Sequence, residues 1–121
     1  MAGSSVINHK GKRIVFMDLS NTTDYNESIA ALKEAEPMIR KEQPGSVLTI
    51  LDISNSPFNR EITNYLREFA EKNKPYVKMT VVTGVDGMKR IVVDGVIMFT
   101  RRTNIVTKDN NEQAKDYLAS L

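Results

Sequence analysis

The stretch VLTILDISNSPFN, residues 47–59, decides the fold class of this chain. Its first part, residues 47–52, is a continuous apolar run of strand length, which is typical of an inner strand covered by helices. The loop 53–56 that follows contains Ser54, Asn55 and Ser56, which are common turn formers, and Ser56–Pro57 is the order favoured at a helix start. We therefore expect a central strand that leads through a polar loop into a helix.

Strand and helix patterns alternate on both sides of this stretch. Residues 13–19 and 76–83 predict further strands. In residues 25–41 and 58–74, apolar side chains recur every three or four positions, as in helices that bury one face. A parallel neighbour is reached only through a long return path, which a helix supplies. The order strand, helix, strand, helix, strand therefore predicts an α/β fold.

The remaining segments extend this pattern at both ends. Residues 6–8 precede a glycine turn and predict a hairpin with the first main strand. Pro37 falls inside the first helical pattern, where a missing N–H predicts a kink or a break near Glu36. The chain closes with a predicted short strand at 104–107 and a helix over 109–121. No internal repeat and no low-complexity linker is visible.

Residues 84–102 allow two structures. Asp94–Gly95 lies between two apolar runs and is a strongly favoured two-residue hairpin turn. Read as a helix, the segment presents one apolar face, formed by Val85, Met88, Val92 and Phe99. The helix would carry Gly95 at a cost of about 1 kcal/mol relative to alanine. Local propensity slightly favours the hairpin.

Length and composition indicate one folded domain. The chain has 121 residues, within the usual single-domain range of about 100–200. Apolar residues make up 40% and charged residues 26%, which are ordinary values for globular proteins. We expect a single domain over residues 1–121, in which residues 1–5 are flexible.

Charge and cysteine content exclude several functions. The net charge is only +2, so no global field favours nucleic acid or an anionic membrane. Cysteine is absent, which removes disulfides, thiolate nucleophiles and cysteine-ligated metals. The single histidine, His9, has no partner at a metal-ligand spacing. No apolar run reaches the roughly 20 residues of a membrane span, and residues 1–5 lack a secretory signal. We expect a cytoplasmic protein without a cofactor, a bound metal, nucleic-acid binding or stable membrane insertion.

The strongest candidate for a binding site follows the central strand. Open α/β sheets place sites at the carboxyl edge of their strands. The recognition loop, as we name it, comprises Asp52, Ser54, Asn55, Ser56 and Asn59. A neighbouring candidate surface for a partner or ligand comprises Phe58, Gly84, Asp86, Gly87, Met88 and Lys89. The simpler interpretation is that Ser56 caps the second helix and that Asp52 and Ser54 form a turn.

Three segments together resemble a known family. They are RIVFMDL at 13–19, VLTILDIS at 47–54 and EKNKPYVKMTVVTGVDGMKRIV at 71–92. From about residue 10 onward the chain looks like the bacterial and archaeal SpoIIAA-like proteins. These are relatives of the STAS domain (sulfate transporter and anti-sigma antagonist) and of the CRAL-TRIO lipid-transfer fold. The resemblance implies a single mixed, mostly parallel sheet of about four or five strands with about four helices. It also implies a helix in 84–102, against the local preference.

The resemblance implies a non-catalytic interaction and regulatory module that binds another protein. STAS anti-sigma antagonists carry a phosphorylatable serine in an Asp-Ser-Ser-Gly motif at the start of the helix after the central strand. The matching loop here offers Ser54 and Ser56, although the motif itself is missing. A phosphate there would add roughly −1.5 to −2 charges at a helix start. A homo-oligomer is compatible with the sequence.

Two alternatives remain open. The first is a carrier of a small apolar or lipid-like ligand, whose pocket would be lined by Phe58, Phe69, Met88, Met98 and Phe99. The second is a metal-dependent enzyme that uses Asp18, Asp52 or Asp86. It is less favoured, because these carboxylates show no metal-binding spacing.

Overall fold

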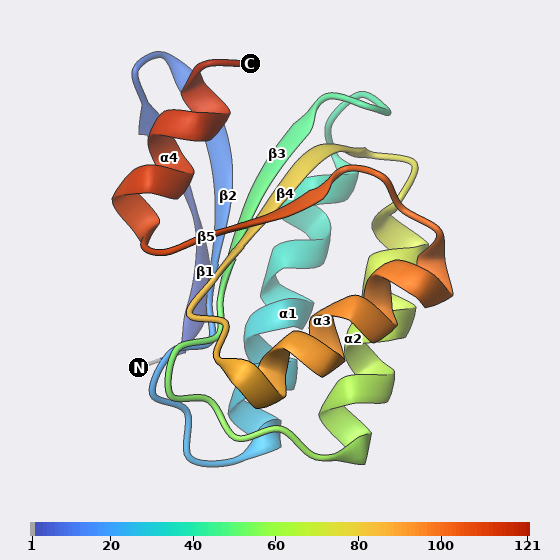
Figure 1. The fold of residues 1–121 in the computed structure, drawn as a ribbon. Coiled ribbons are helices and arrows are strands. Elements are labelled where there is room, and N and C mark those ends of the chain that lie inside the picture. The colour runs from blue at the N-terminus through green and yellow to red at the C-terminus, as the bar shows by residue number, and fades with distance from the viewer. Residues whose placement is uncertain (1) are drawn as a thin grey trace.

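The computed structural model describes residues 2–121, and over this range the chain forms five strands and four helices (Figure 1). In chain order they are β1 (Gly3–His9), β2 (Lys12–Asp18), α1 (Tyr25–Arg40), β3 (Val47–Asp52), α2 (Arg60–Asn73), β4 (Val77–Thr83), α3 (Gly87–Thr100), β5 (Ile105–Lys108) and α4 (Asn111–Ala119). The predicted fold class, α/β with a single mixed and mostly parallel sheet, is confirmed.

The strands lie in the sheet in the same order as in the chain. β1 pairs with β2 in antiparallel fashion, and every later neighbour is parallel. Right-handed crossovers that all step in one direction place their helices on one face of a sheet. Accordingly α1, α2 and α3 lie on one side of the sheet, and α4 lies on the other (Figure 1). β3 is the central strand, as predicted.

Each face of the sheet carries its own apolar layer. Successive side chains of a strand point to opposite faces, so Val15 packs beneath α1 and α2 while its neighbour Ile14 packs beneath α4. The layer under α1 and α2 also contains Leu32, Ile39 and Ile62, which are fully buried. The thinner layer under α4 is built around Ile50, Val81 and Leu118. The residues near α3 form a third, smaller cluster around Ile53, Val82 and Val93.

Within residues 84–102 the chain forms α3, from Gly87 to Thr100, so the local preference for a hairpin is wrong. The reason lies in β5, which runs parallel to β4. A two-residue turn joins only antiparallel strands, whereas a parallel partner requires a long crossover. Asp86 begins the helix by accepting a hydrogen bond from the backbone N–H of Lys89 at 3.2 Å. The helix implied by the family resemblance is therefore observed.

The start of α2 differs from the prediction. Ser56 was expected to cap this helix, but the helix begins at Arg60, and Asn59 Oδ1 accepts the capping hydrogen bond from the N–H of Ile62 at 2.9 Å. The Ser56 hydroxyl is turned inward instead and lies 2.8 Å from that of Thr22. The prediction failed because a long-range hydroxyl pair competes with the local cap.

Two other expectations need correction. Of the kink or break expected near Glu36, the break does not occur, since α1 continues through Pro37 to Arg40 and Ile39 in its last turn is fully buried. The segment 3–5, expected to be flexible, forms the first part of β1 and pairs with residues 16–18 of β2. Ser4 Oγ also donates a hydrogen bond to the carbonyl of Ala31 at 2.6 Å. Met1 lies outside the described residues.

Candidate functional site

The recognition loop lies at the carboxyl edge of β3, where hydrogen bonds from the loop itself and from α4 hold the side chain of its first residue. The carboxylate of Asp52 is buried, with 7% of the residue exposed. Its Oδ1 accepts hydrogen bonds from the backbone N–H of Ser54 at 2.9 Å and from Ser54 Oγ at 2.7 Å. Its Oδ2 accepts from Asn111 Nδ2 at 2.9 Å. Asp52 therefore organises the loop and is already occupied by protein donors.

The same turn occurs twice, side by side. Residues 18–22 (DLSNT) and 52–56 (DISNS) follow two neighbouring strands, and Asp18 lies opposite Asp52 in the sheet register. Asp18 Oδ1 accepts from the N–H and the hydroxyl of Ser20, just as Asp52 accepts from Ser54. We call these segments the paired turns. Sequence reasoning missed this repeat, although the shared pattern Asp-[Leu/Ile]-Ser-Asn-[Thr/Ser] could have revealed it.

Contacts between the paired turns fix them to each other. Asn21 and Asn55 both adopt left-handed backbone conformations, with φ of 58° and 52°. Asn is one of the few residue types that tolerate this region. Asn55 Nδ2 donates to Asn21 Oδ1 at 3.1 Å. The paired turns thus form a hydrogen-bonded rim, and Asn55 is the exposed residue of the recognition loop at this rim.

The two candidate serines differ in accessibility. Ser56 is only 4% exposed, so a kinase would reach its hydroxyl only after the loop opens. Ser54 is partly exposed, and its hydroxyl donates to Asp52. A phosphate on Ser54 would stand beside that buried carboxylate, where like charges repel.

The second group of predicted residues lies beside the recognition loop, at the start of α3. Gly84 has a φ of 77° and lies against the backbone and side chain of Ser54. Lys89 is 9% exposed, and its Nζ donates to the carbonyl of Ile53 at 2.7 Å, so it is not a surface cation. The structure therefore brings the loop and the start of α3 together through backbone and side-chain contacts.

The remaining predicted residues point in different directions. Asp86 caps α3, and Gly87 opens the helix at a place where an added Cβ would meet no atom within 4 Å. Met88 is 83% exposed. Phe58 is partly buried and faces the interior instead of the surface.

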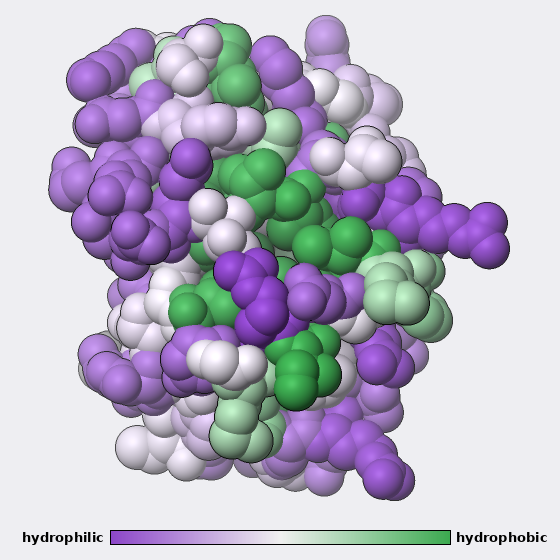
Figure 2. All heavy atoms as spheres, viewed as in Figure 1, coloured by the Kyte–Doolittle hydropathy of each residue, from purple (hydrophilic) through white to green (hydrophobic). Residues whose placement is uncertain are grey.

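The outer face of α3 is the most apolar exposed surface in the described part of the chain. Four side chains of this helix are large, apolar and exposed: Met88 at 83%, Ile91 at 75%, Met98 at 79% and Phe99 at 56%. Only Val6 and Leu121 join them among the large exposed apolar side chains of residues 2–121. Figure 2 shows apolar side chains among polar ones on the face of the molecule that carries α3. A helix that is apolar all round is normally buried.

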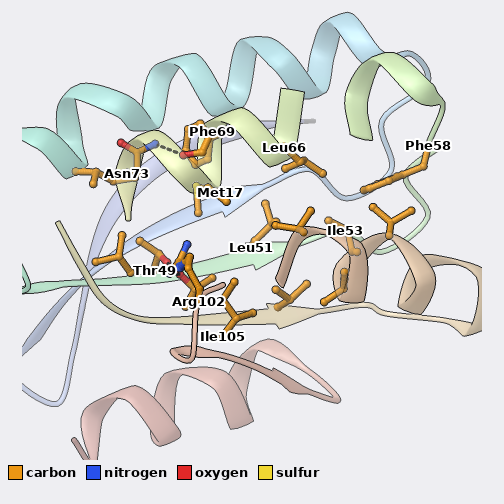
Figure 3. Close-up of a pocket in the computed structure, with 18 residues that line it drawn as sticks. Met17, Thr49, Leu51, Ile53, Phe58, Leu66, Phe69, Asn73, Arg102 and Ile105 are labelled. Carbon is orange, nitrogen blue, oxygen red and sulfur yellow. Dashed lines mark hydrogen bonds between the residues drawn. The ribbon is translucent and has the colours of Figure 1, made fainter. Parts of the chain in front are cut away.

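A cavity of about 60 Å³ lies on the inner side of α3, between this helix, α2 and the sheet. Figure 3 shows Phe58 and Ile53 at one end, and Arg102, Asn73 and Thr49 at the other. The wall from α3 consists of Val92, Val93 and Val96. Of the five side chains expected to line an apolar pocket, Phe58 and Phe69 do so. Met88, Met98 and Phe99 do not, because the helical phase turns them outward.

Arg102 was not singled out from the sequence, yet it is the charged group of this cavity. Only 7% of the residue is exposed. Its Nε donates to Asn104 Oδ1 at 2.9 Å, and its Nη2 donates to Thr80 Oγ1 at 2.8 Å. Burial lowers the pKa of Arg102 to about 10, while the negative charge of Glu71 acts in the opposite direction.

No catalytic constellation is assembled by the residues that sequence reasoning considered. Asp18 and Asp52 are engaged in the paired turns, and Asp86 caps α3. Within residues 2–121 no group of three or more potential metal-ligating side chains comes together. His9 lies at the turn between β1 and β2, at the opposite edge of the sheet, where its Nε2 is 2.8 Å from Asp116 Oδ1.

The sequence matches no protein-family model and no curated protein. The resemblance to SpoIIAA-like proteins therefore stays a prediction. Among the described helices, none combines the length and the apolar character needed to cross a membrane.

Proposed function

We propose that this chain is a non-catalytic interaction module that binds another protein through the outer face of α3. The observation that carries the proposal is the exposure of Met88, Ile91, Met98 and Phe99 on one helix. Methionine and aromatic side chains are enriched at protein interfaces. Large apolar side chains that gather on one exposed helix face commonly mark interaction sites on soluble domains. A docking partner would remove these side chains from water.

The charged groups around this face suit a polar rim. Arg90 and Asp94 are exposed on the same helix, and Arg101 follows its last turn. An interface usually has an apolar centre surrounded by polar groups that remain in contact with water. The four apolar side chains would supply the centre, and these charges would orient the partner.

Site-specific photo-crosslinking in cells of the source organism tests the proposal. A photoreactive amino acid at position 91 should form a covalent adduct with one defined protein, which mass spectrometry identifies. The matched control carries the same amino acid at Glu68, an exposed position on α2 outside the patch. Adducts that are equally abundant at both positions would contradict docking on α3. An adduct of twice the chain mass would identify the partner as a second copy.

The recognition loop supplies a means of regulating that face, and we include it in the proposal. Ser54 contacts Gly84, and Lys89 binds the carbonyl of Ile53, so the loop supports the first turn of α3. Phosphate at Ser54 would be repelled by the carboxylate of Asp52 and would displace this support. Phosphopeptide mapping of the native protein tests the switch. Unmodified Ser54 under all growth conditions would remove the switch and leave the docking face untouched.

A further inference from the structure

The cavity beneath α3 has a chemical polarity that points to a ligand. Seventeen of its lining residues are uncharged and mostly apolar, and Arg102 is the one that carries charge. The apolar end lies near Phe58 and Ile53, and the guanidinium lies at the end shared with Asn73 (Figure 3). A site with an apolar body and one charged end matches a molecule built in the same way.

The other polar side chains of the cavity are already engaged with each other or with the backbone. Thr49 Oγ1 and Thr80 Oγ1 lie 2.7 Å apart. Asn73 Nδ2 donates to the carbonyl of Phe69 at 2.9 Å, and its Oδ1 accepts from Arg40 Nε at 3.1 Å. Arg102 is different, because its Nη1 forms no hydrogen bond with any described residue, although this atom is not fully enclosed: within residues 2–121 the buried side-chain nitrogen without a partner is Arg67 Nε.

Arg102 also lacks a negative partner within residues 2–121. No Asp or Glu side chain in that range lies within salt-bridge distance of its guanidinium, although six other ion pairs occur there. A buried charge is costly unless an opposite charge compensates it. Two neutral hydrogen-bond acceptors, Thr80 and Asn104, satisfy part of the guanidinium, and the carboxylate of Glu71 acts on its charge only from beyond salt-bridge distance.

We propose that this cavity binds a small carboxylate with a short apolar chain. The Nη1 group of Arg102 would donate to the carboxylate, and the chain would run along the Val92, Val93 and Val96 wall toward Phe58. Arginine suits this task because its planar fork of N–H donors matches carboxylate geometry.

The dimensions of the cavity limit the ligand. An apolar cavity of about 150 Å³ takes up benzene. The present cavity, at about 60 Å³, has less than half of that volume, so a ligand with a chain of a few carbons fits only when the valine side chains of its α3 wall move aside. Inorganic phosphate is a poorer match, because it carries more charge than one arginine balances and has no apolar part for the valine wall. The ligand site lies under α3, whereas the proposed docking face lies on top of it, so the two can be tested separately.

Titration of isotope-labelled protein with butanoate, followed by NMR, tests the site. Saturable shifts are expected at the Arg102 Nε–H signal and at the methyl groups of Val93 and Val96. Butanol, which keeps the chain and lacks the charge, and acetate, which keeps the charge and lacks the chain, should both bind more weakly. Butanoate that produces no saturable shift at these signals in the unmodified protein would overturn the proposal without any variant being needed.

Two substitutions of Arg102, with a control at Arg101, test whether the guanidinium binds butanoate. Arg102→Met keeps a long side chain and removes the charge, so butanoate should bind on the order of tenfold to a hundredfold more weakly. Arg102→Lys retains the charge without the fork and should give intermediate affinity. Arg101→Met is the matched control, because Arg101 is the exposed neighbour and its loss should leave the affinity unchanged. Equal loss in Arg101→Met and Arg102→Met, or no loss in Arg102→Met, would refute a role for Arg102.

Discussion

Gly84 packs against Ser54 so closely that a methyl group on Gly84 would overlap the Ser54 Oγ, N and Cα atoms. This contact joins the end of β4 to the recognition loop that leaves β3. Gly84 also has a φ of 77°, a backbone conformation that residues other than glycine rarely adopt. The first prediction concerns this residue.

Gly84→Ala should lower the free energy of unfolding by about 2–4 kcal/mol, because it adds backbone strain to a clash with a neighbouring backbone. Urea denaturation monitored by circular dichroism measures the loss. Gly87→Ala is the control, since a Cβ there meets no atom within 4 Å. Similar free energies of unfolding for the two variants would show that the loop around Ser54 accommodates the added methyl group without loss of stability.

Ser54→Asp should loosen the start of α3. The new carboxylate would face the buried carboxylate of Asp52, and both the repulsion and the lost hydroxyl donor would displace the loop from Gly84. We expect a loss of about 1–3 kcal/mol in stability and faster amide exchange at the first turn of α3. Asn55→Asp, which adds the same charge at the exposed next residue, should change that exchange much less.

Replacing Ile91 and Met98 together by glutamine should leave the fold intact. Both side chains are at least three-quarters exposed, so their removal should change the free energy of unfolding by no more than about 0.5 kcal/mol each. Val93→Gln, on the buried side of the same helix, should cost about 2–4 kcal/mol. Thermal unfolding distinguishes the two cases. A destabilised Ile91 and Met98 variant would mean that these residues support the fold.

The contribution of Asp116 to stability should depend on pH. Hydrogen bonds from His9 and then Lys10 hold the pKa of Asp116 below its ordinary value of 3.8. A carboxyl group whose pKa is lowered on folding stabilises the fold above its ordinary pKa, and that contribution disappears as the pH falls through the folded value. Asp116→Asn should therefore melt below the unmodified protein at neutral pH. The difference in melting temperature between the two proteins should disappear in acid. A difference that persists at pH 2 would contradict this account.

The fold could be predicted from the sequence to the extent that its signals are local and periodic. The apolar run at residues 47–52 and the helical stripe of residues 58–74 identified the central strand and α2. Residues 84–102 required long-range information, because only the parallel pairing of β5 with β4 excludes the hairpin that Asp94–Gly95 favours. The cap of α2 was misassigned for a similar reason, since Ser56 binds Thr22 from a different loop.

The candidate sites were less predictable than the fold. The position of the recognition loop followed from general rules for α/β sheets, but the burial of Ser56 depends on its packing against Thr22. Met98 and Phe99 point outward because of their positions around the α3 helix. This orientation could not be derived from the sequence, because the local pattern also allowed a hairpin. Arg101 and Arg102 are adjacent in the sequence, and so short a basic run is typical of solvated surface. Only the three-dimensional structure shows that one of these arginines enters a cavity and the other remains outside.

The match between strand order and chain order affects how this protein can be made. Because each strand pairs with the strand that precedes it, every newly synthesised strand finds its hydrogen-bonding partner already outside the ribosome. The sheet can therefore grow by one strand at a time during translation, beginning with the hairpin of β1 and β2. The layer beneath α4 is the exception, since it closes only after α4 itself has emerged.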